Sequence, residues 1–263
     1  MRLEVISKES TAENRHPTPV LFVHGLFAGI WSWTEHFIDY FAAHGYTTHA
    51  PSLRGHGQSE GRARLRWTRL ADYVDDVEQV VAQLPTPPVL IGHSYGGAII
   101  QKYLETHTAP AAVLLASVPP RGLLQIALRT ARRHPLAFLR ANLTLSLYPL
   151  VSTPALARDL FFSVGMSEEK VCGYQARMSD KSFRGFLDML FLNLPKPERI
   201  TTPMLVMGAA NDTYLRPGQV EATARAYHAQ AIIFPNMCHG MMLEEDWEDV
   251  AGRIIAWLHE KRL

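Results

Sequence analysis

The chain has 263 residues, of which 47% are hydrophobic and 19% are charged, and its formal net charge is +1. This composition excludes a disordered chain, the length suffices for a sizeable core, and the charge argues against a dedicated nucleic-acid binder. The two cysteines, Cys172 and Cys238, form neither a disulfide framework nor a zinc-ligand spacing. No run approaches the roughly 20 apolar residues that span a bilayer, and the N-terminus shows no signal-peptide core. We therefore expect a cytoplasmic protein without stable membrane insertion.

Short apolar runs alternate with helical patterns along the chain, which is typical of a mainly parallel sheet with helices on both faces. A first strand or hairpin is expected at Leu3–Ser7. The further strands are expected at Pro19–Val23, Thr47–Ala50, Val89–Ile91, Ala112–Ala116, Met204–Met207 and Ala231–Phe234. The helices are expected at Trp31–His44, Leu70–Leu84, Tyr95–Thr106, Pro217–His228 and Trp247–Lys261. The second of these helices has the apolar spacing of an amphipathic helix.

The stretch from Pro119 to Pro195 interrupts this alternation. It has no convincing strand, is punctuated by prolines, and carries ten basic against five acidic residues, a net charge of +5. We interpret residues 119–195 as a helical cap inserted into a core formed by residues 1–118 and 196–263. The large apolar side chains of the cap either pack it onto the sheet or line an apolar substrate pocket.

Residues Gly92-His93-Ser94-Tyr95-Gly96 follow a short apolar run and open a helical pattern. An apolar strand that turns sharply through a single serine into a helix is a nucleophile elbow. Glycine is needed two residues to either side, because a larger side chain would crowd the backbone of so tight a turn. The serine hydroxyl then lies exposed at a helix start, where backbone N–H groups favour developing negative charge. The pattern predicts Ser94 as a nucleophile.

A serine nucleophile needs a base within hydrogen-bond reach and a carboxylate that orients the base. His239 is the candidate base, because it follows the last predicted strand in a loop beside Gly240. Asp212 is the candidate acid, and we expect it at the carboxyl end of a strand adjacent to the one that carries Ser94. The order serine, acid, histidine is the one expected for this kind of fold.

The negative oxygen of a tetrahedral intermediate needs hydrogen-bond donors. The chain turns sharply at Gly25 after the first main strand, so the backbone N–H of Leu26 can pair with that of Tyr95 as an oxyanion hole. We expect His24 to shape this turn rather than to act as a base. Three arginines of the cap, Arg129, Arg132 and Arg133, are either a solvated face or a site for an acidic substrate or a membrane surface.

These residues together resemble the α/β-hydrolase superfamily. The resemblance rests on Val-His-Gly-Leu at 23–26, Leu-Arg-Gly-His-Gly-Gln-Ser at 53–59, Gly-His-Ser-Tyr-Gly-Gly at 92–97, Asp212 and His239. It covers the chain outside the cap and implies an α/β-hydrolase fold with a Ser-His-Asp triad. The segment from Ala50 to Gly61 further resembles the monoacylglycerol lipase and lysophospholipase-like branch, in which residues 54–59 form a structural loop beside the site.

The expected activity is hydrolysis of a carboxylic ester, with an apolar or medium-chain acyl group, as in esterases and lipases. Ser94 disfavours the epoxide hydrolases and haloalkane dehalogenases of this superfamily, which use an aspartate at the elbow. A carbon–carbon bond hydrolase or a perhydrolase with the same triad remains open, and so does a non-catalytic receptor for a small ligand. We expect a small-molecule ester as the partner, no nucleic acid, no cofactor and no metal, and the oligomeric state stays open.

Overall fold

The computed structural model describes residues 1–263, and its centre is a seven-stranded sheet in the order β1-β3-β2-β4-β5-β6-β7. The strands are β1 (Val5–Lys8), β2 (Val20–Val23), β3 (Thr48–Pro51), β4 (Val89–His93), β5 (Ala112–Leu115), β6 (Met204–Ala209) and β7 (Gln230–Phe234). Only β1 is antiparallel to its neighbour. The inner strands β2 to β6 are buried on both faces. This explains the continuous apolar sequences of β2, β5 and β6, whereas β3 contains Thr48 and His49. The predicted mainly parallel sheet is confirmed.

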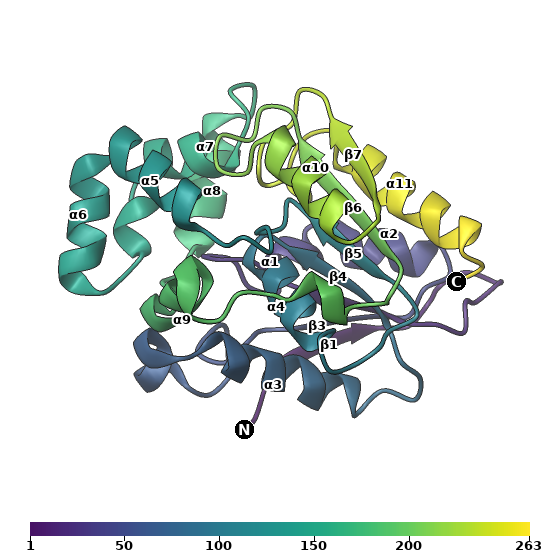
Figure 1. The fold of residues 1–263 in the computed structure, drawn as a ribbon. Coiled ribbons are helices and arrows are strands. Elements are labelled where there is room, and N and C mark those ends of the chain that lie inside the picture. The colour runs from purple at the N-terminus through teal and green to yellow at the C-terminus, as the bar shows by residue number, and fades with distance from the viewer.

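Helices cover both faces of the sheet (Figure 1). They are α1 (Trp31–Thr34), α2 (Phe37–Ala43), α3 (Leu70–Val81), α4 (Tyr95–Tyr103), α10 (Pro217–Ala226) and α11 (Trp247–Glu260). Helices α2 and α11 pack together on one face, whereas α3 and α4 pack together on the other face. The predicted helices begin where expected, and their C-terminal ends lie within three residues of the predicted ends.

The prediction of one continuous helix at Trp31–His44 is wrong. The expected helix Trp31–His44 is broken into α1 and α2, because His36 has φ −143° and ψ −53°, outside the helical region. The ring of His36 stacks on that of Trp247 in α11, with centroids 4.5 Å apart. A tertiary contact therefore accompanies the break, and the local pattern of apolar residues did not reveal it.

The stretch between β5 and β6 is helical and contains no strand. Its helices are α5 (Leu124–Arg133), α6 (Pro135–Thr144), α7 (Pro154–Phe161), α8 (Glu168–Arg177) and α9 (Phe183–Leu187), followed by a π-helical turn at Asp188–Leu192. Short 3-10 turns occur at Tyr148–Leu150 and Pro197–Arg199 in this stretch, and a further one occurs before it at Arg62–Trp67. The side chains of Thr153, Ser167 and Ser182 cap α7, α8 and α9 by accepting a backbone N–H of the first turn. We call this stretch the helical insertion.

The helical insertion and the sheet share one hydrophobic core, a single cluster of 70 buried residues. It joins the inner strands to side chains of the insertion such as Phe161, Phe162 and Phe183. The two parts are continuous in this core, and the division into residues 1–118 with 196–263 and 119–195 stays a prediction. No helix of the chain combines the length and the hydropathy that crossing a membrane requires.

Candidate active site

Ser94 lies on the sharp turn between β4 and α4. Its φ of 53° and ψ of −116° are strained for a residue with a side chain. A Cβ atom on Gly96 would lie 2.2 Å from the Val23 carbonyl oxygen, and one on Gly92 would lie 2.7 Å from the Gly97 nitrogen. Both distances are far below van der Waals contact, so glycine is required at both positions. The elbow predicted from the sequence therefore forms. The close packing of the backbone around Gly92 and Gly96 keeps Ser94 in its strained conformation.

A hydrogen-bonded chain runs from Ser94 through His239 to Asp212. The Ser94 Oγ atom lies 2.9 Å from His239 Nε2, and His239 Nδ1 lies 2.7 Å from Asp212 Oδ2. The imidazole Nδ1–H can donate to the carboxylate, which leaves Nε2 to accept the serine hydroxyl proton. The structure thus brings together all three residues expected to act as nucleophile, base and acid.

Backbone donors orient the Asp212 carboxylate from its other side. The Asp212 Oδ1 atom accepts the N–H of Tyr214 at 2.8 Å and that of Leu215 at 2.7 Å. The Asp212 and His239 side chains are fully buried. The carboxylate therefore has few alternative positions, and it presents its second oxygen to the imidazole.

The expectation that Asp212 follows a strand adjacent to that of Ser94 is wrong. Strand β5 lies between β4, which precedes Ser94, and β6, which precedes Asp212. The end of β5 packs against the elbow, since the Ser94 N–H donates to the Leu115 carbonyl at 2.9 Å. Parallel strands bring their carboxyl ends to one edge of the sheet, and the loops after β6 and β7 reach back along this edge.

His93 supports the site, although its sequence position did not single it out. It is the last residue of β4, and its Nε2 lies 2.8 Å from the His239 carbonyl oxygen. Burial, and then the nearby His239, lower the pKa of His93 to about 3. A neutral ring with Nε2 protonated therefore donates to that carbonyl. The only sequence signal was a polar residue in a continuous buried strand, directly before the serine.

His24 has a structural environment, as expected. Its Nε2 accepts the N–H of Leu53 at 3.1 Å, and its Nδ1 lies 3.1 Å from the Gly25 carbonyl oxygen. Burial, and then the neighbouring Lys181, hold the pKa of His24 well below its usual value. A neutral ring with both nitrogens bonded to backbone joins the turn after β2 to the loop after β3.

The two expected oxyanion donors flank the elbow. Leu26 follows the turn at Gly25, where a Cβ atom would lie 3.0 Å from the Ser94 Cβ. Tyr95 is the first residue of α4, so its N–H has no carbonyl one turn earlier in the helix to pair with. Both backbones lie next to Ser94, which is compatible with the predicted pair of donors.

The helical insertion closes the site from solvent. Ser94 is 1% exposed and His239 is fully buried. The rings of Phe161 from α7 and Tyr214 from the loop after β6 pack edge-on against His239, with centroids 5.2 and 5.3 Å away. The Gly240 N–H also donates to the Phe161 carbonyl at 2.7 Å. The candidate nucleophile and base are therefore buried, with Phe161 and Tyr214 packed against the base.

Residues 20–253 match the family model described as the alpha/beta hydrolase family. The chain belongs to this family. It is 33% identical over 110 residues to a non-heme chloroperoxidase of Streptomyces lividans, covering 40% of this chain and 39% of that protein. It is 30% identical over 105 residues to a monoacylglycerol lipase of Mycolicibacterium smegmatis, covering 38% and 37%. The chain thus matches about two fifths of the length of these relatives.

The solved structure of a monoacylglycerol lipase of Paleococcus ferrophilus is similar over the whole fold. Its TM-score is 0.75 at 21% identity, and the match covers 99% of this chain and 100% of that chain. The predicted α/β-hydrolase fold, with its mainly parallel sheet and helical insertion, is confirmed, and so is the resemblance to monoacylglycerol lipases.

Proposed function

We propose that this protein hydrolyses carboxylic esters through Ser94, His239 and Asp212. The observation that carries the proposal is the unbroken hydrogen-bonded chain from the Asp212 carboxylate to the Ser94 hydroxyl, with the serine on a strained elbow. Membership of the alpha/beta hydrolase family supports a hydrolytic reaction. The proposal further specifies that the bond cleaved is a carboxylic ester.

In the proposed mechanism, Ser94 Oγ attacks the ester carbonyl while His239 Nε2 takes the hydroxyl proton. The backbone N–H groups of Leu26 and Tyr95 hold the negative oxygen of the tetrahedral intermediate, and loss of one such donor costs about 3 kcal/mol of barrier. The protonated His239 then gives its proton to the departing alcohol, which leaves an acyl group on Ser94. Water, deprotonated by His239, attacks this acyl group and releases the acid.

The acyl group is proposed to be apolar or of medium chain length. An apolar pocket of about 10 Å³ adjoins the elbow. Its apolar lining residues include Leu26, Trp31, Phe161, Phe162, Met178 and Met242. The pocket is far smaller than an acyl chain, and the flexible side chains of Met178 and Met242 can repack around a ligand. The apolar lining supports an apolar acyl group, and the small volume implies that the helical insertion shifts when the chain enters.

A perhydrolase or a carbon–carbon bond hydrolase with the same triad is the competing proposal. The partial similarity to a non-heme chloroperoxidase favours the first of these. Peracid formation from acetate and hydrogen peroxide, and turnover of diketone acids, would each be compared with simple ester hydrolysis. A receptor is the weaker alternative, because a binding protein has no need for the hydrogen-bonded triad.

The proposed location is the cytoplasm, with a small-molecule ester as the partner and no nucleic acid. Both cysteines are unpaired, and Cys172 is exposed. Free exposed thiols fit a reducing compartment.

The decisive experiment is a panel of p-nitrophenyl esters of increasing acyl length, run on the wild type and on Ser94→Ala. The variant is expected to fold normally, since the Oγ atom bonds only to His239, and to lose turnover. The matched control is Ser152→Ala, an exposed serine of the helical insertion, which is expected to keep full activity. Undiminished ester hydrolysis by Ser94→Ala would refute the proposal, and the acyl-length optimum of the wild type would measure the pocket.

A further inference from the structure

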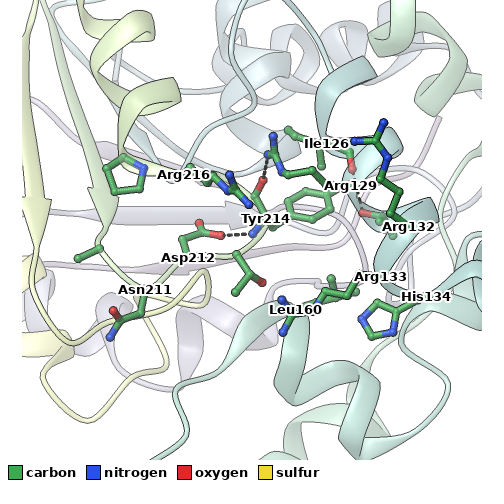
Figure 2. Close-up of a pocket in the computed structure, with 14 residues that line it drawn as sticks. Ile126, Arg129, Arg132, Arg133, His134, Leu160, Asn211, Asp212, Tyr214 and Arg216 are labelled. Atoms are coloured by element: carbon green, nitrogen blue, oxygen red, sulfur yellow. Dashed lines mark hydrogen bonds between the residues drawn. The ribbon is translucent and has the colours of Figure 1, made fainter.

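An open cleft lies between the helical insertion and the sheet, on the side of Asp212. Its volume is about 620 Å³, within the range of small-ligand sites. Figure 2 shows side chains of α5 on one side of it and the loop after β6, with Asn211, Asp212 and Tyr214, on the other. The basic residues that line it are Arg129, Arg132, Arg133, His134 and Arg216.

The positive charges of this arginine cleft exceed the negative charges that face them. Asp159 of α7 bonds to both Arg133 and His134. Asp212 also lines the cleft, but its two oxygens bond to His239 and to backbone N–H groups. No carboxylate forms an ion pair with the other three arginines, and no acidic residue occurs from position 119 to 158. Three guanidinium groups from two segments are therefore not paired with a carboxylate.

Arg129 is held in place within the cleft. Its Nη2 donates to the Tyr214 carbonyl oxygen at 2.7 Å and to Gln219 Oε1 at 2.6 Å. Its Nε–H is buried and has no acceptor. Burial, and then the nearby Arg216, lower the pKa of Arg129. The Asp212 carboxylate acts in the opposite direction but less strongly than Arg216, so a bound anion would relieve the remaining repulsion between the two guanidinium groups.

We propose that the arginine cleft is a binding site for an anionic group, a phosphate or a carboxylate. Guanidinium groups recognise both through paired hydrogen bonds in a planar arrangement. Arg129 supplies a fixed, half-buried positive charge at the wall of the cleft, and its Nη1 is the group left to donate, because Nη2 already donates to Tyr214 and Gln219. Arg132 and Arg216 are exposed and supply the paired hydrogen bonds to the anion. The anion comes either from the ester substrate itself or from a separate molecule.

Besides Asp212, which lines it, the cleft reaches the candidate triad through Tyr214. Arg129 bonds to the carbonyl of Tyr214, and the N–H of Tyr214 bonds to Asp212 Oδ1. The ring of the same tyrosine packs against His239. An anion on Arg129 therefore lies one residue away from the groups that orient the imidazole, so its binding is expected to change ester kinetics.

The site itself is tested by isothermal titration calorimetry with inorganic phosphate at constant ionic strength. The proteins compared are Ser94→Ala, the same protein with Arg132→Ala and Arg216→Ala, and the same protein with Arg140→Ala. Arg132 and Arg216 form no ion pair, so the double variant is expected to keep its fold. A thermal melting curve checks this. Arg140 is exposed on α6 and does not line the cleft. We expect the dissociation constant to rise about tenfold or more in the Arg132/Arg216 variant and to stay constant in the Arg140 control.

No phosphate binding, or equal binding by all three proteins, would overturn the proposal. Because these proteins carry Ser94→Ala, the binding result does not depend on ester hydrolysis. If wild type proves inactive on every ester, the proposed function fails while the binding result stands.

The source of the anion is found with matched substrates on the protein that retains Ser94. The p-nitrophenyl half-esters of adipic and suberic acid are compared with the hexanoate and octanoate. If the substrate carries the anion, the half-esters have the lower KM, phosphate competes with them, and Arg132→Ala/Arg216→Ala removes the preference. If the anion is separate, phosphate changes turnover of charged and neutral esters alike. Each result supports the site and identifies its ligand.

Discussion

Three separate contacts fix the position of His239. Asp212 bonds to its Nδ1, Ser94 to its Nε2, and His93 to its backbone carbonyl. The first two contacts set the tautomer and the direction of the ring, and the third fixes the loop that carries it. A base that must accept and return a proton without reorienting needs this restraint.

Asp212→Asn is expected to lower kcat by about four orders of magnitude with little change in KM. The amide oxygen can still accept the N–H groups of Tyr214 and Leu215, so the fold is retained, but an amide NH₂ facing His239 favours the wrong tautomer. Steady-state kinetics on the best p-nitrophenyl ester measure this. Asp180→Asn, which replaces a carboxylate bonded to the Leu147 and Tyr148 N–H groups, is the control. A similar small loss in both variants would contradict the role of Asp212.

The buried His93 makes the free energy of unfolding depend on pH in the acidic range. Its pKa falls from the ordinary 6.5 to about 3 on folding, so between these values the unfolded chain binds a proton that the folded chain does not. The free energy of unfolding therefore decreases as the pH falls through this window, by up to about 1.4 kcal/mol per pH unit. The depressed pKa values of His24 and His56 act in the same direction.

His93→Gln is expected to make this decrease shallower. An amide NH₂ can still donate to the His239 carbonyl, and the titrating group is gone. Urea denaturation between pH 7 and pH 4 gives the slope for each protein, with the exposed His228→Gln as the control. An unchanged slope in His93→Gln would show that His93 does not contribute to the acid sensitivity.

At the scale of elements, the site depends on how closely β2, β4 and α4 approach one another. The main chain of α4 passes so near the end of β2 that a Cβ atom on Gly96 would lie 2.2 Å from the Val23 carbonyl and 2.7 Å from the His24 carbonyl. This approach brings the start of α4, with the Tyr95 N–H, beside the turn that carries Leu26. Gly96 therefore permits both the elbow and the close approach of the two expected oxyanion donors, Leu26 and Tyr95.

Gly96→Ala is expected to destabilise the protein by roughly 3 kcal/mol or more, because neither carbonyl can move without disrupting the sheet. Gly173→Ala is the matched control, since Gly173 is also helical, is exposed on α8, and has no atom within 4 Å of an added Cβ. It is expected to gain about 0.5–1 kcal/mol from helix propensity. Denaturant unfolding and ester turnover are measured for both. A Gly96→Ala protein as stable and active as wild type would contradict the close approach.

At the scale of the whole molecule, the helical insertion is tied to the sheet by polar as well as apolar contacts. Arg177 forms an ion pair with Glu35 at 2.8 Å, the Thr213 hydroxyl donates to the Asp159 carbonyl at 2.9 Å, and the Ser163 N–H donates to Glu244 at 2.8 Å. The helical insertion is thus bonded to several loops of the sheet and also completes the core.

Thermal unfolding is expected to be a single cooperative transition, because the insertion and the sheet share one hydrophobic core. Scanning calorimetry tests this through the ratio of the van't Hoff to the calorimetric enthalpy, expected near unity. Two resolved transitions would instead support an independently folding cap at residues 119–195.

The chain sequence by itself determined the features that depend on neighbouring residues. Glycines around Ser94 predict the elbow, because its steric limits act within a few residues, and alternating apolar runs predict the parallel sheet. The order of Ser94, Asp212 and His239 predicted the triad through resemblance to a known family.

Only the tertiary structure decided how distant segments meet. It placed β5 between the strands that precede Ser94 and Asp212, and it broke the helix at His36 beside Trp247. It also joined His93 to His239 across 146 residues and Arg129 to Tyr214 across 85. Each of these contacts depends on the packing of elements that are far apart in the chain. A pattern of adjacent residues does not specify which distant segment will pack against those residues.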